Sequence, residues 1–389
     1  MKIINKVKKL QNKKQPAQKS KEWYSLRNTC ITASEASSCL HLSEEICKTY
    51  LDEFPTSKLK FNENKNLSPF DTLESYIINK CDSYFNIGKG FVSNKYTEWG
   101  NKYEPIAVQL YMKEKNTNVL EFGFLQHSRL KWLGASPDGI TNDGIMLEIK
   151  CPYSRKLSSY PPIYYWVQCQ IQMEVCNLDE CDFLECNIKE ISLTEFNNLE
   201  NIQYYGIIIE NDLTNEKIIE ETNEKVNNEI IEEMNQEIIE ETNEKVNNEI
   251  IEETNEKVNN EIIEEINEKV NNEIIEETNI CKFLYPPLEC KTKQDYINWS
   301  NTKKGKKIYF KVDKFQIIKI NRKKEWFNVV KSKLKNTYDL LQKYFKNKND
   351  FLNYKESCKV LNNKKYLDKI TNTECLIDDV SSFEFDLSD

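Results

Sequence analysis

Histidine, glycine and proline are scarce in this chain, and long apolar runs are missing. Only 2 His, 9 Gly and 10 Pro occur among 389 residues. No stretch of about 18 consecutive apolar residues occurs, so the sequence predicts no membrane-spanning helix. The basic beginning, MKIINKVKKLQNKKQPAQKSK, lacks the apolar segment of a signal peptide. We therefore expect an intracellular protein that is not secreted and binds no membrane.

The chain also has few residues from which a histidine or paired-cysteine metal site could be built. The only histidines are His41 and His127, and the 13 cysteines include no Cys-x-x-Cys pair. Cys176, Cys181 and Cys186 are evenly spaced, but buried free thiols explain them better than a metal cluster in a reducing compartment. We therefore expect no iron–sulfur cluster, and a structural rather than catalytic role for His127.

An acidic low-complexity segment occupies residues 215–278. Its 12-residue unit NEKVNNEIIEET occurs at 243–254 and again at 267–278, with near copies at 223–234 and 255–266. Twelve helical residues turn through about 1,200°, which is about 120° past a whole number of turns. The apolar pairs therefore do not form the single stripe of a coiled coil. We expect an exposed spacer that is helical or partly disordered, with a partner-binding rod as the alternative.

This segment hides the charge balance of the remaining chain. Residues 215–279 contain 22 Glu and 5 Lys, a net charge of −17, whereas the whole chain has 54 basic and 63 acidic residues, a net charge of −9. The rest of the chain therefore has 54 − 5 = 49 basic and 63 − 22 = 41 acidic residues, a net charge of +8. A basic folded part fits a polyanionic partner such as nucleic acid.

The pattern outside the repeat predicts alternating helices and strands. The 17 Phe, 20 Tyr and 6 Trp are enough for a folded core. Residues 22–40 predict two short helices, with Ser34 as the N-cap of the second, and residues 53–70 predict a loop. Further helices are expected at 97–115, 163–176 and 324–345, and strands within 119–127, 130–141, 144–152, 181–191 and 307–322. This order favours an α/β or α+β fold with a mixed sheet flanked by helices.

The stretch GASPDGITNDGIMLEIK, residues 134–150, predicts a hairpin with charged residues on one face. Asn-Asp-Gly at 142–144 is a turn signal, and its glycine suits a positive φ. A turn centred on residue 143 places Asp138 and Glu148 opposite each other. Glu148 and Lys150 share a face of the strand because they are two residues apart. One face of the hairpin is therefore expected to gather two carboxylates and an ammonium group.

This set of side chains suits metal-assisted hydrolysis of a phosphodiester. Carboxylate oxygens bind Mg²⁺, and the bound metal lowers the pKa of a water molecule and neutralises charge on the phosphate. The Lys150 ammonium can stabilise the attacking hydroxide or a phosphate oxygen. A surface cluster of salt bridges would show the same spacing, so the spacing alone leaves both interpretations open.

Five stretches in order resemble the YqaJ-like viral recombinase family, the lambda-exonuclease type of restriction-endonuclease-like nuclease. The resemblance covers roughly residues 20–205 and, less sharply, 281–345, where it is similar to versions found in large DNA viruses. The stretches are EWYSLRNTCITAS (22–34), WGNKYEPIA (99–107), GASPDG (134–139), LEIKCP (147–152) and VQCQIQM (167–173).

The resemblance assigns the catalytic step to the charged face of the hairpin. Asp138, Glu148 and Lys150 would be the catalytic set. Glu104 and the Ile149 carbonyl would complete the metal site with the two hairpin carboxylates. Mg²⁺ is the implied cofactor, with Mn²⁺ able to replace it.

The resemblance also assigns residues outside the hairpin. Arg27 and Ser34 would bind the 5′ phosphate of the DNA. The alternatives are a surface charge for Arg27 and a helix cap for Ser34, and Ser34 can serve both roles. Gln168 and Gln170 fill the last motif, and their spacing on a helix lets only one reach the site. We favour Gln170. The nearby aromatic residues, Trp132, Tyr164, Tyr165 and Trp166, are expected to be core rather than base-stacking residues.

The expected domain organisation is a nuclease domain interrupted by the acidic repeat. It comprises a flexible basic tail (1–20), the nuclease core (21–210), the acidic insertion (211–280), a strand and helix that complete the nuclease domain (281–346), and a C-terminal tail (347–389). Because the insertion would repel DNA, we expect it to project away from the active-site face. A long surface insertion costs little closure entropy.

The function implied by the resemblance is a Mg²⁺-dependent DNA exonuclease that acts 5′ to 3′ on double-stranded ends in recombination or repair. The implied partners are double-stranded DNA ends, a single-strand-annealing protein and further copies of the chain. A viral protein of this kind would work in the host cytoplasm, in a viral factory, or in the nucleus. The alternative is a non-catalytic DNA-binding or scaffolding protein on a nuclease fold, with the repeat as its interaction element.

Overall fold

The computed structural model describes residues 2–87, 94–200, 202–211 and 283–360. The chain forms two compact units. The first consists of Met1–Gly100, Tyr111–Cys186 and Phe315–Asp389, and the second of Asn101–Leu110 and Asn187–Lys314. The acidic repeat and residues 361–389 of the predicted C-terminal tail lie outside the described residues. No helix in the described part is long and apolar enough to cross a membrane.

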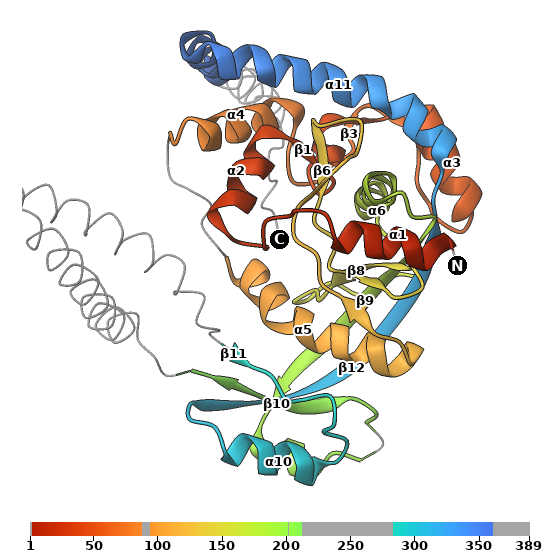
Figure 1. Cartoon of the computed structure of the whole chain (residues 1–389), viewed down its shortest axis with the longest axis vertical. Coiled ribbons are helices and arrows are strands. Elements are labelled where there is room, and N and C mark those ends of the chain that lie inside the picture. The colour runs from red at the N-terminus through yellow and green to blue at the C-terminus, as the bar shows by residue number, and fades with distance from the viewer. Residues whose placement is uncertain (1, 88–93, 201, 212–282, 361–389) are drawn as a thin grey trace, which may run out of the picture. The chain divides into compact units, whose positions relative to one another are not determined.

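The order of elements follows the predicted alternation of helices and strands (Figure 1). The helices are α1 (Lys2–Gln11), α2 (Lys21–Thr29), the 3₁₀ turn η1 (Ala36–Cys39), α3 (Glu44–Glu53), α4 (Leu73–Tyr84), α5 (Lys95–Lys115), α6 (Ile163–Cys176), α7 (Leu193–Asn197), α10 (Lys293–Asn301) and α11 (Lys324–Lys346). The strands are β1 (Ile31–Thr32), β2 (His41–Leu42), β3 (Asn62–Asn66), β4 (Val119–Leu120), β5 (Leu125–Gln126), β6 (Leu133–Ala135), β7 (Gly139–Thr141), β8 (Met146–Lys150), β9 (Glu180–Ile191), β10 (Tyr205–Glu210), β11 (Phe283–Leu284) and β12 (Lys306–Asn321).

The main sheet of the first unit contains strands of both directions. Its order is β12-β9-β8-β7-β4. β4 and β7 are antiparallel, β7 and β8 form an antiparallel hairpin, and β8 runs parallel to β9. Two smaller sheets, β1-β6-β5 and β2-β3, complete the strands of this unit. The predicted mixed sheet flanked by helices is therefore confirmed for the described residues.

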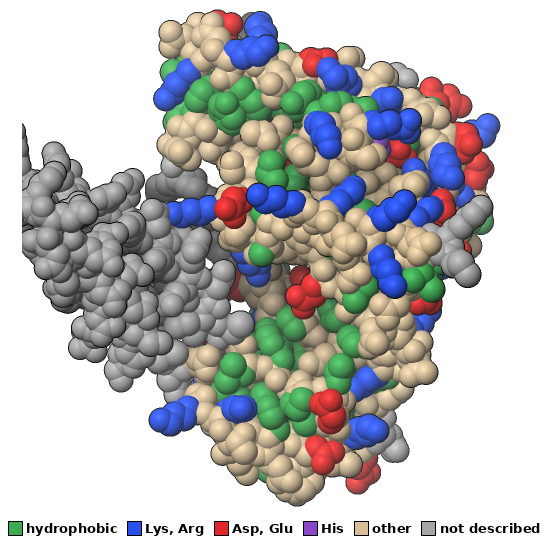
Figure 2. All heavy atoms as spheres, viewed as in Figure 1, with side chains coloured by type: hydrophobic (Ala, Val, Ile, Leu, Met, Phe, Trp, Pro, Cys, Tyr) green, Lys and Arg blue, Asp and Glu red, His purple; other side chains and the backbone are tan. Residues whose placement is uncertain are grey.

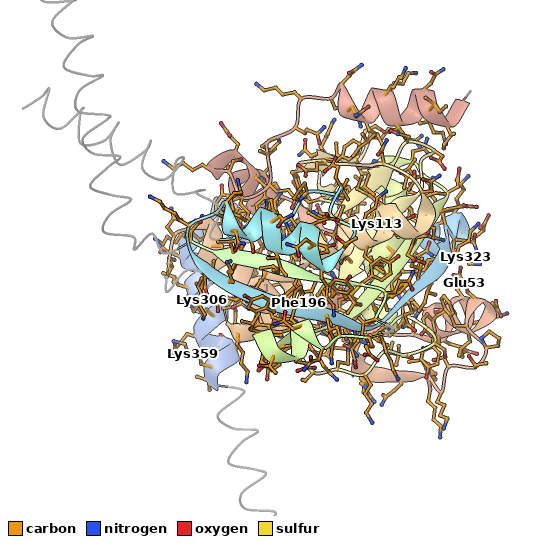
Figure 3. The ribbon with its side chains drawn as sticks, turned by 90° about the horizontal axis from the view of Figure 1, so that it is seen from below. Glu53, Lys113, Phe196, Lys306, Lys323 and Lys359 are labelled. Carbon is orange, nitrogen blue, oxygen red and sulfur yellow. The ribbon has the colours of Figure 1, made fainter. Side chains whose placement is uncertain are left out.

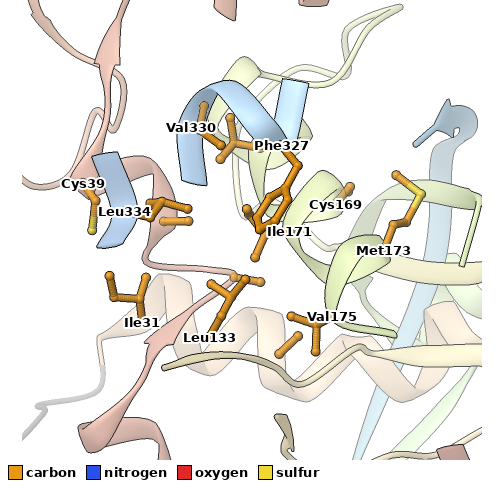
Figure 4. Close-up of a cluster of buried hydrophobic side chains, with 14 of the residues drawn as sticks. Ile31, Cys39, Leu133, Cys169, Ile171, Met173, Val175, Phe327, Val330 and Leu334 are labelled. Carbon is orange, nitrogen blue, oxygen red and sulfur yellow. The ribbon is translucent and has the colours of Figure 1, made fainter. Parts of the chain in front are cut away.

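Helix α6 is the centre of the hydrophobic core of the first unit. It is apolar on almost every side, as expected for a helix buried all round. Ile171 of α6 packs in one cluster with Leu133 of β6 and with Phe327 and Val330 of α11 (Figure 4). Each such buried side chain contributes roughly 1.5–3 kcal/mol relative to an exposed one. The core therefore fixes the helix that stands against β8 and β9.

The region between residues 31 and 84 differs from its sequence-based prediction. The second short helix is only the 3₁₀ turn η1, and its N-cap is Glu35, which makes no capping hydrogen bond, so Ser34 is not the cap. Part of the predicted loop forms β3, because it pairs with β2. Helix α4 was not predicted, although Thr72 and Ser75 form a capping box at its start.

The N-terminal arm, residues 2–21, is folded rather than flexible. Val7 and Leu10 on one face of α1 are buried, and their burial anchors the helix. The backbone N–H of Gly123 donates to Gln15 Oε1 at 2.8 Å, and Phe124 N donates to the Pro16 carbonyl at 3.1 Å. The predicted tail is therefore part of the folded first unit, because its apolar residues find a surface on which to pack.

The C-terminal tail is also partly ordered. Residues 348–360 are helical, and Phe351 is fully buried in the core of the first unit. Lys355 Nζ bonds both carboxylate oxygens of Asp82 at 2.6 Å, which ties this helix to α4. The predicted boundary at residue 346 matches the end of α11, but a further helix follows it.

The second unit has a hydrophobic core of its own, and β10 and β11 are the end strands of the seven-stranded sheet. β10 pairs antiparallel with β12 over six residues and with β11 over two. Phe196, Ile207 and Tyr296 form part of a buried cluster under this sheet. Glu190 at the end of β9 accepts hydrogen bonds from Lys102 Nζ at 2.6 Å and Tyr103 Oη at 2.9 Å, both on α5.

Candidate active site

The β7–β8 hairpin has the register that its turn predicted. Gly139 pairs with Leu147 and Ile140 with Met146. The same register carried one residue further places Asp138 opposite Glu148. Gly144 adopts a φ of 80°, as the turn requires, and a side chain there would clash with Ile3 of α1. The two carboxylates therefore face each other at the open end of the hairpin.

Asp138 is half-buried and holds the neighbouring strand. Its Oδ2 accepts a hydrogen bond from the backbone N–H of Ile149 at 2.7 Å. The Ile149 side chain is buried in the core, opposite in direction to its two charged neighbours on β8. This bond keeps the Asp138 carboxylate beside the backbone of Ile149.

Glu148 is fully buried, and two partners bind its carboxylate. Lys150 Nζ donates to Oε1, and Gln172 Nε2 of α6 donates to Oε2 at 2.8 Å. Burial alone would lower the pKa of Lys150, but the charges of Glu148 and Asp138 outweigh it and hold that pKa above its usual range. The ammonium group is therefore held in its charged form beside the carboxylates.

A second buried acid on the next strand escaped the sequence analysis. In the parallel pair β8–β9, Glu185 is the partner of Lys150, and Glu185 is fully buried. It bonds the Arg155 guanidinium and accepts from Gln316 Nε2 at 2.7 Å. Tyr165 covers these cations, with Lys150 Nζ 4.9 Å and Arg155 Cζ 6.0 Å from its ring centre. The alternation of β9 could have indicated Glu185, but not its strand partner.

The structure separates the glutamines of the last motif. The Gln170 side chain donates to the Asn321 carbonyl at 2.8 Å and accepts from Lys323 N at 2.7 Å, so it holds the connection between β12 and α11. Lys323 also lies 3.9 Å from Glu53 of α3, beside it in Figure 3. Gln172, which was not predicted, is the glutamine that contacts Glu148.

Gln168 is half-buried and has surroundings different from those of Gln170. It lines a cavity of about 110 Å³ together with Ser34 and Tyr165. Tyr164 lines the same cavity and is half-buried, as is Tyr165, whereas Trp132 and Trp166 are core residues. Gln168 thus lines a cavity, whereas Gln170 bonds backbone atoms within the protein, and the role of either glutamine at the site stays a prediction.

Arg27 and Ser34 lie close together. Arg27 Nη2 is 3.5 Å from Ser34 Oγ, and Ser34 is exposed. The Arg27 guanidinium stacks over Trp23 at 4.3 Å, and Trp23 Nε1 donates to Ser136 Oγ at 2.9 Å. Ser136 precedes Asp138 by two residues, so this chain of contacts joins the Arg27–Ser34 pair to the hairpin.

A buried ion pair supports Arg27 from below. Lys80 Nζ of α4 bonds the Glu35 carboxylate at 2.8 Å and the Arg27 backbone carbonyl at 2.6 Å. Burial alone would raise the pKa of Glu35, but the charges of Lys80 and Arg27 outweigh it and lower that pKa. The Glu35 carboxylate therefore remains charged and holds the Lys80 ammonium, which in turn bonds the Arg27 backbone carbonyl.

Glu104 belongs to a different unit from the other predicted residues. It lies half-buried on the part of α5 that falls within the second unit, whereas Asp138, Glu148, Lys150, Arg27 and Ser34 fall within the first. His127 has a structural role, because its Nδ1 accepts from the backbone N–H of Leu130 at 2.9 Å. The described cysteines are all buried free thiols.

The oxygen donors on the hairpin fit a small hard cation. Asp138, Glu148 and the Ile149 carbonyl offer only oxygen ligands, the type that Mg²⁺ prefers. Gln172 Oε1, beside Glu148, is buried without a hydrogen-bond partner. No group of three or more His, Cys, Asp or Glu residues suited to a metal occurs in the described part of the chain. The site therefore supplies two carboxylates, and other ligands would be carbonyl oxygens, water or substrate.

Comparison with known proteins agrees with the motifs. Residues 22–179 match the family described as the YqaJ-like viral recombinase domain. This segment therefore resembles a YqaJ-like viral recombinase domain, and the predicted resemblance is confirmed. An uncharacterized protein of Acanthamoeba polyphaga mimivirus is 35% identical over 191 residues, which are 44% of this chain and 30% of that relative. The match thus spans under a third of the relative's length.

Solved structures of exonucleases are also similar to this chain. An alkaline exonuclease from Laribacter hongkongensis, LHK-Exo, has been solved by itself and in complex with dAMP. It is 24% identical, with a TM-score of 0.31 over 43% of this chain and 74% of that chain. A phage related exonuclease from Haemophilus somnus is 14% identical, with a TM-score of 0.29 over 41% of this chain and 68% of that chain.

Proposed function

We propose that this chain is a metal-dependent DNA exonuclease that degrades double-stranded DNA from its ends. The observation that carries the proposal is the charged face of the β7–β8 hairpin, where Asp138, Glu148 and Lys150 meet. The contacts from Ser136 through Trp23 to Arg27 add a phosphate-binding pair beside it. The YqaJ-like domain supports nuclease chemistry at this site.

Asp138, Glu148 and the Ile149 carbonyl would hold the cation, with Mg²⁺ as the proposed ion and Mn²⁺ able to replace it. Such an ion lowers the pKa of a bound water and neutralises charge on the phosphate. Glu104 stays a proposed supporting residue. The contribution of this chain is a rigid frame, because Gln172 fixes one oxygen of Glu148 and Ile149 N fixes one oxygen of Asp138.

The side chains around the frame would bind the DNA. The Lys150 ammonium is the cation nearest the two carboxylates and would contact the attacking hydroxide or a phosphate oxygen. Arg27 and Ser34 would anchor the terminal 5′ phosphate, since an exposed hydroxyl and a guanidinium bind phosphate oxygens well. Gln168 would face the DNA from α6, and Gln170 would serve the fold.

Polarity from 5′ to 3′, a role in recombination or repair, and action in a viral factory or nucleus belong to this proposal. A single-strand-annealing protein and further copies of this chain are its proposed partners. An Arg27–Ser34 pair selective for a 5′ phosphate supports the stated polarity, because the strand would then be held by its 5′ end.

The test is digestion of duplex DNA labelled at the 5′ or 3′ end, with Mg²⁺ and with EDTA. We expect cleavage by the wild type with Mg²⁺ alone, and loss of cleavage in Glu148→Ala and Lys150→Ala. Arg27→Ala should raise KM for 5′-phosphorylated ends, whereas exposed Arg129→Ala serves as the matched control. Undiminished cleavage in both hairpin variants would refute the assigned site.

A second candidate is a non-catalytic DNA-binding protein on the same fold. One observation favours it: both oxygens of the buried Glu148 carboxylate already have hydrogen-bond partners within the protein. Under this candidate the wild type binds duplex ends in gel-shift experiments but cleaves none with Mg²⁺ or Mn²⁺. Cleavage by the wild type that is lost in Glu148→Ala excludes it.

A further inference from the structure

A second, larger cavity opens in the first unit beside the proposed active site. Its volume is about 390 Å³, within the size range of small-molecule sites. The end of α3, the β2–β3 sheet, the segment before α4 and the start of α6 contribute its walls. Two lysines and no acidic side chain line it. The cavity therefore combines apolar walls with positive charge.

This cavity adjoins the smaller one lined by Ser34 and Gln168. Tyr164 lines both cavities, and the segment before α4 separates them. Along that segment Pro69 lines the larger cavity, whereas its neighbours Ser68 and Phe70 line the smaller one. Phe70 meets Tyr164 edge to face at 5.3 Å between ring centres. A DNA strand that leaves the proposed active site would therefore reach the larger cavity by passing the Phe70–Tyr164 pair.

The lining groups match the base and the phosphate of a nucleotide. Tyr160 and Tyr164 offer half-buried aromatic surfaces for a base. Lys58 and Lys65 are exposed at the cavity and can bind a phosphate. Asn66 lines the cavity, and its Oδ1 is buried without a hydrogen-bond partner. Every DNA base carries an N–H on its pairing edge that can donate to such an oxygen.

We propose that this cavity binds one unpaired nucleotide of the DNA strand next to the reacting one. The base packs on Tyr160 and Tyr164, its pairing edge donates to Asn66 Oδ1, and its phosphate meets Lys58 and Lys65. The base must be unpaired, because Asn66 takes the place of the complementary base. The identity of the strand rests on the proposed exonuclease function, but the binding itself does not.

The test measures binding without cleavage. A 5′-phosphorylated single-stranded oligonucleotide with a 3′ fluorophore is titrated with the full chain in EDTA and followed by anisotropy. Stacking and phosphate contacts of this kind predict roughly tenfold weaker binding for Tyr160→Ala and for the double variant Lys58→Ala/Lys65→Ala. Lys60→Ala and Phe61→Ala are matched controls, because both residues are exposed on the same segment and neither lines the cavity.

Binding by the cavity variants that equals binding by the controls would overturn the proposal. Thermal melting confirms that each variant is folded. Oligonucleotides with one abasic position then locate the contact: the wild type should lose affinity at a single position, and Tyr160→Ala should lose nothing more there. An abasic series without such a position also overturns the proposal.

Two further arms identify the source of the nucleotide and separate the two proposals. Free dAMP that competes with the oligonucleotide in the wild type, but not in Tyr160→Ala, would show that the cavity also accepts a released nucleotide. If oligonucleotide binding depends on the cavity but the protein has no nuclease activity, the proposed binding site is supported and the proposed exonuclease function is refuted. If the protein cleaves DNA but its cavity variants bind as the controls do, the exonuclease function is supported and the proposed binding site is refuted.

Discussion

The β7–β8 hairpin and the N-terminal arm lie against each other in the first unit, but they owe their structure to different things. The hairpin follows from local chemistry: a turn at 142–144 sets the register that brings Asp138 opposite Glu148. The arm follows from contacts far along the chain. Gln18 Nε2 donates to the carbonyls of Phe122 at 3.0 Å and Pro137 at 3.3 Å.

A segment outside the matched domain, which begins at residue 22, therefore contacts the proposed active site. The arm contacts the hairpin at both ends, at the turn through Ile3 and beside Asp138 through Gln18. Figure 2 shows many Lys and Arg side chains on the face that carries α1. A local element can thus carry the chemistry while a distant segment holds it in place.

The largest expected effect is on the hairpin's chemistry. Glu148→Gln keeps the size of the side chain but removes its charge, so we expect cleavage to fall by about a hundredfold or more. Asp143→Asn, in the exposed turn of the same hairpin, should leave cleavage unchanged. Single-turnover rates on end-labelled duplex measure both, and equal rates would show that the charged face is not the site.

The N-terminal arm should be destabilised by substitutions that remove buried apolar side chains rather than by substitutions that remove charges. Leu10 and Val7 are 5% and 2% exposed, so Leu10→Ala should destabilise the protein by roughly 2–5 kcal/mol and Val7→Ala by less. Ile4, on the same helix but 48% exposed, is the control. Urea unfolding gives the three values. Equal, small losses would mean that the arm behaves as a tail.

Acid should loosen the place where the arm meets the end of α6. Lys6 Nζ donates to the Asn177 carbonyl at 3.1 Å, and Arg322 binds Asn177 and Glu174. Burial alone would raise the pKa of Glu174, but His127 and Arg322 outweigh it and lower that pKa from 4.5 to about 2. Because the pKa of Glu174 is lower in the folded state, its ionised carboxylate stabilises the fold fully at pH values above the unfolded pKa of 4.5. This stabilisation is lost as the pH falls towards the folded pKa of about 2.

The measurable consequence is a loss on the order of 3 kcal/mol between about pH 5 and pH 2. Glu174→Gln should remove this part of the pH dependence of unfolding, whereas Glu180→Gln, at an exposed pair with Lys319, should keep it. Urea denaturation at a series of pH values is the measurement, and identical profiles for the two variants would contradict the assignment.

The smallest effect is expected where the two regions touch. Gln18→Ala removes two hydrogen bonds to carbonyls beside the site, which predicts a loss of about 1–2 kcal/mol in stability. Because Pro137 precedes Asp138, the rate constant for cleavage should also fall several-fold at saturating DNA. Gln11→Ala, exposed at the end of α1, is the control. A change in stability without a change in rate would separate the arm from the site.

Local sequence patterns were enough to predict the hairpin, its charged face and most long elements. The turn residues and the two-residue period of strands are local, so Asp138, Glu148 and Lys150 could be placed before any tertiary contact was known. Helix α6, β9, β12 and α11 were predicted within one or two residues for the same reason, because long periodic segments carry their own signal.

Which distant side chains join that face depends on the packing of the folded chain. The parallel pairing of β8 with β9 brings Glu185 beside Lys150, and the rotation of α6 selects Gln172 rather than Gln170 as the partner of Glu148. The fold of the arm depends likewise on the surface that receives Val7. Contacts between segments remote in sequence depend on packing, and no local period along one chain encodes them.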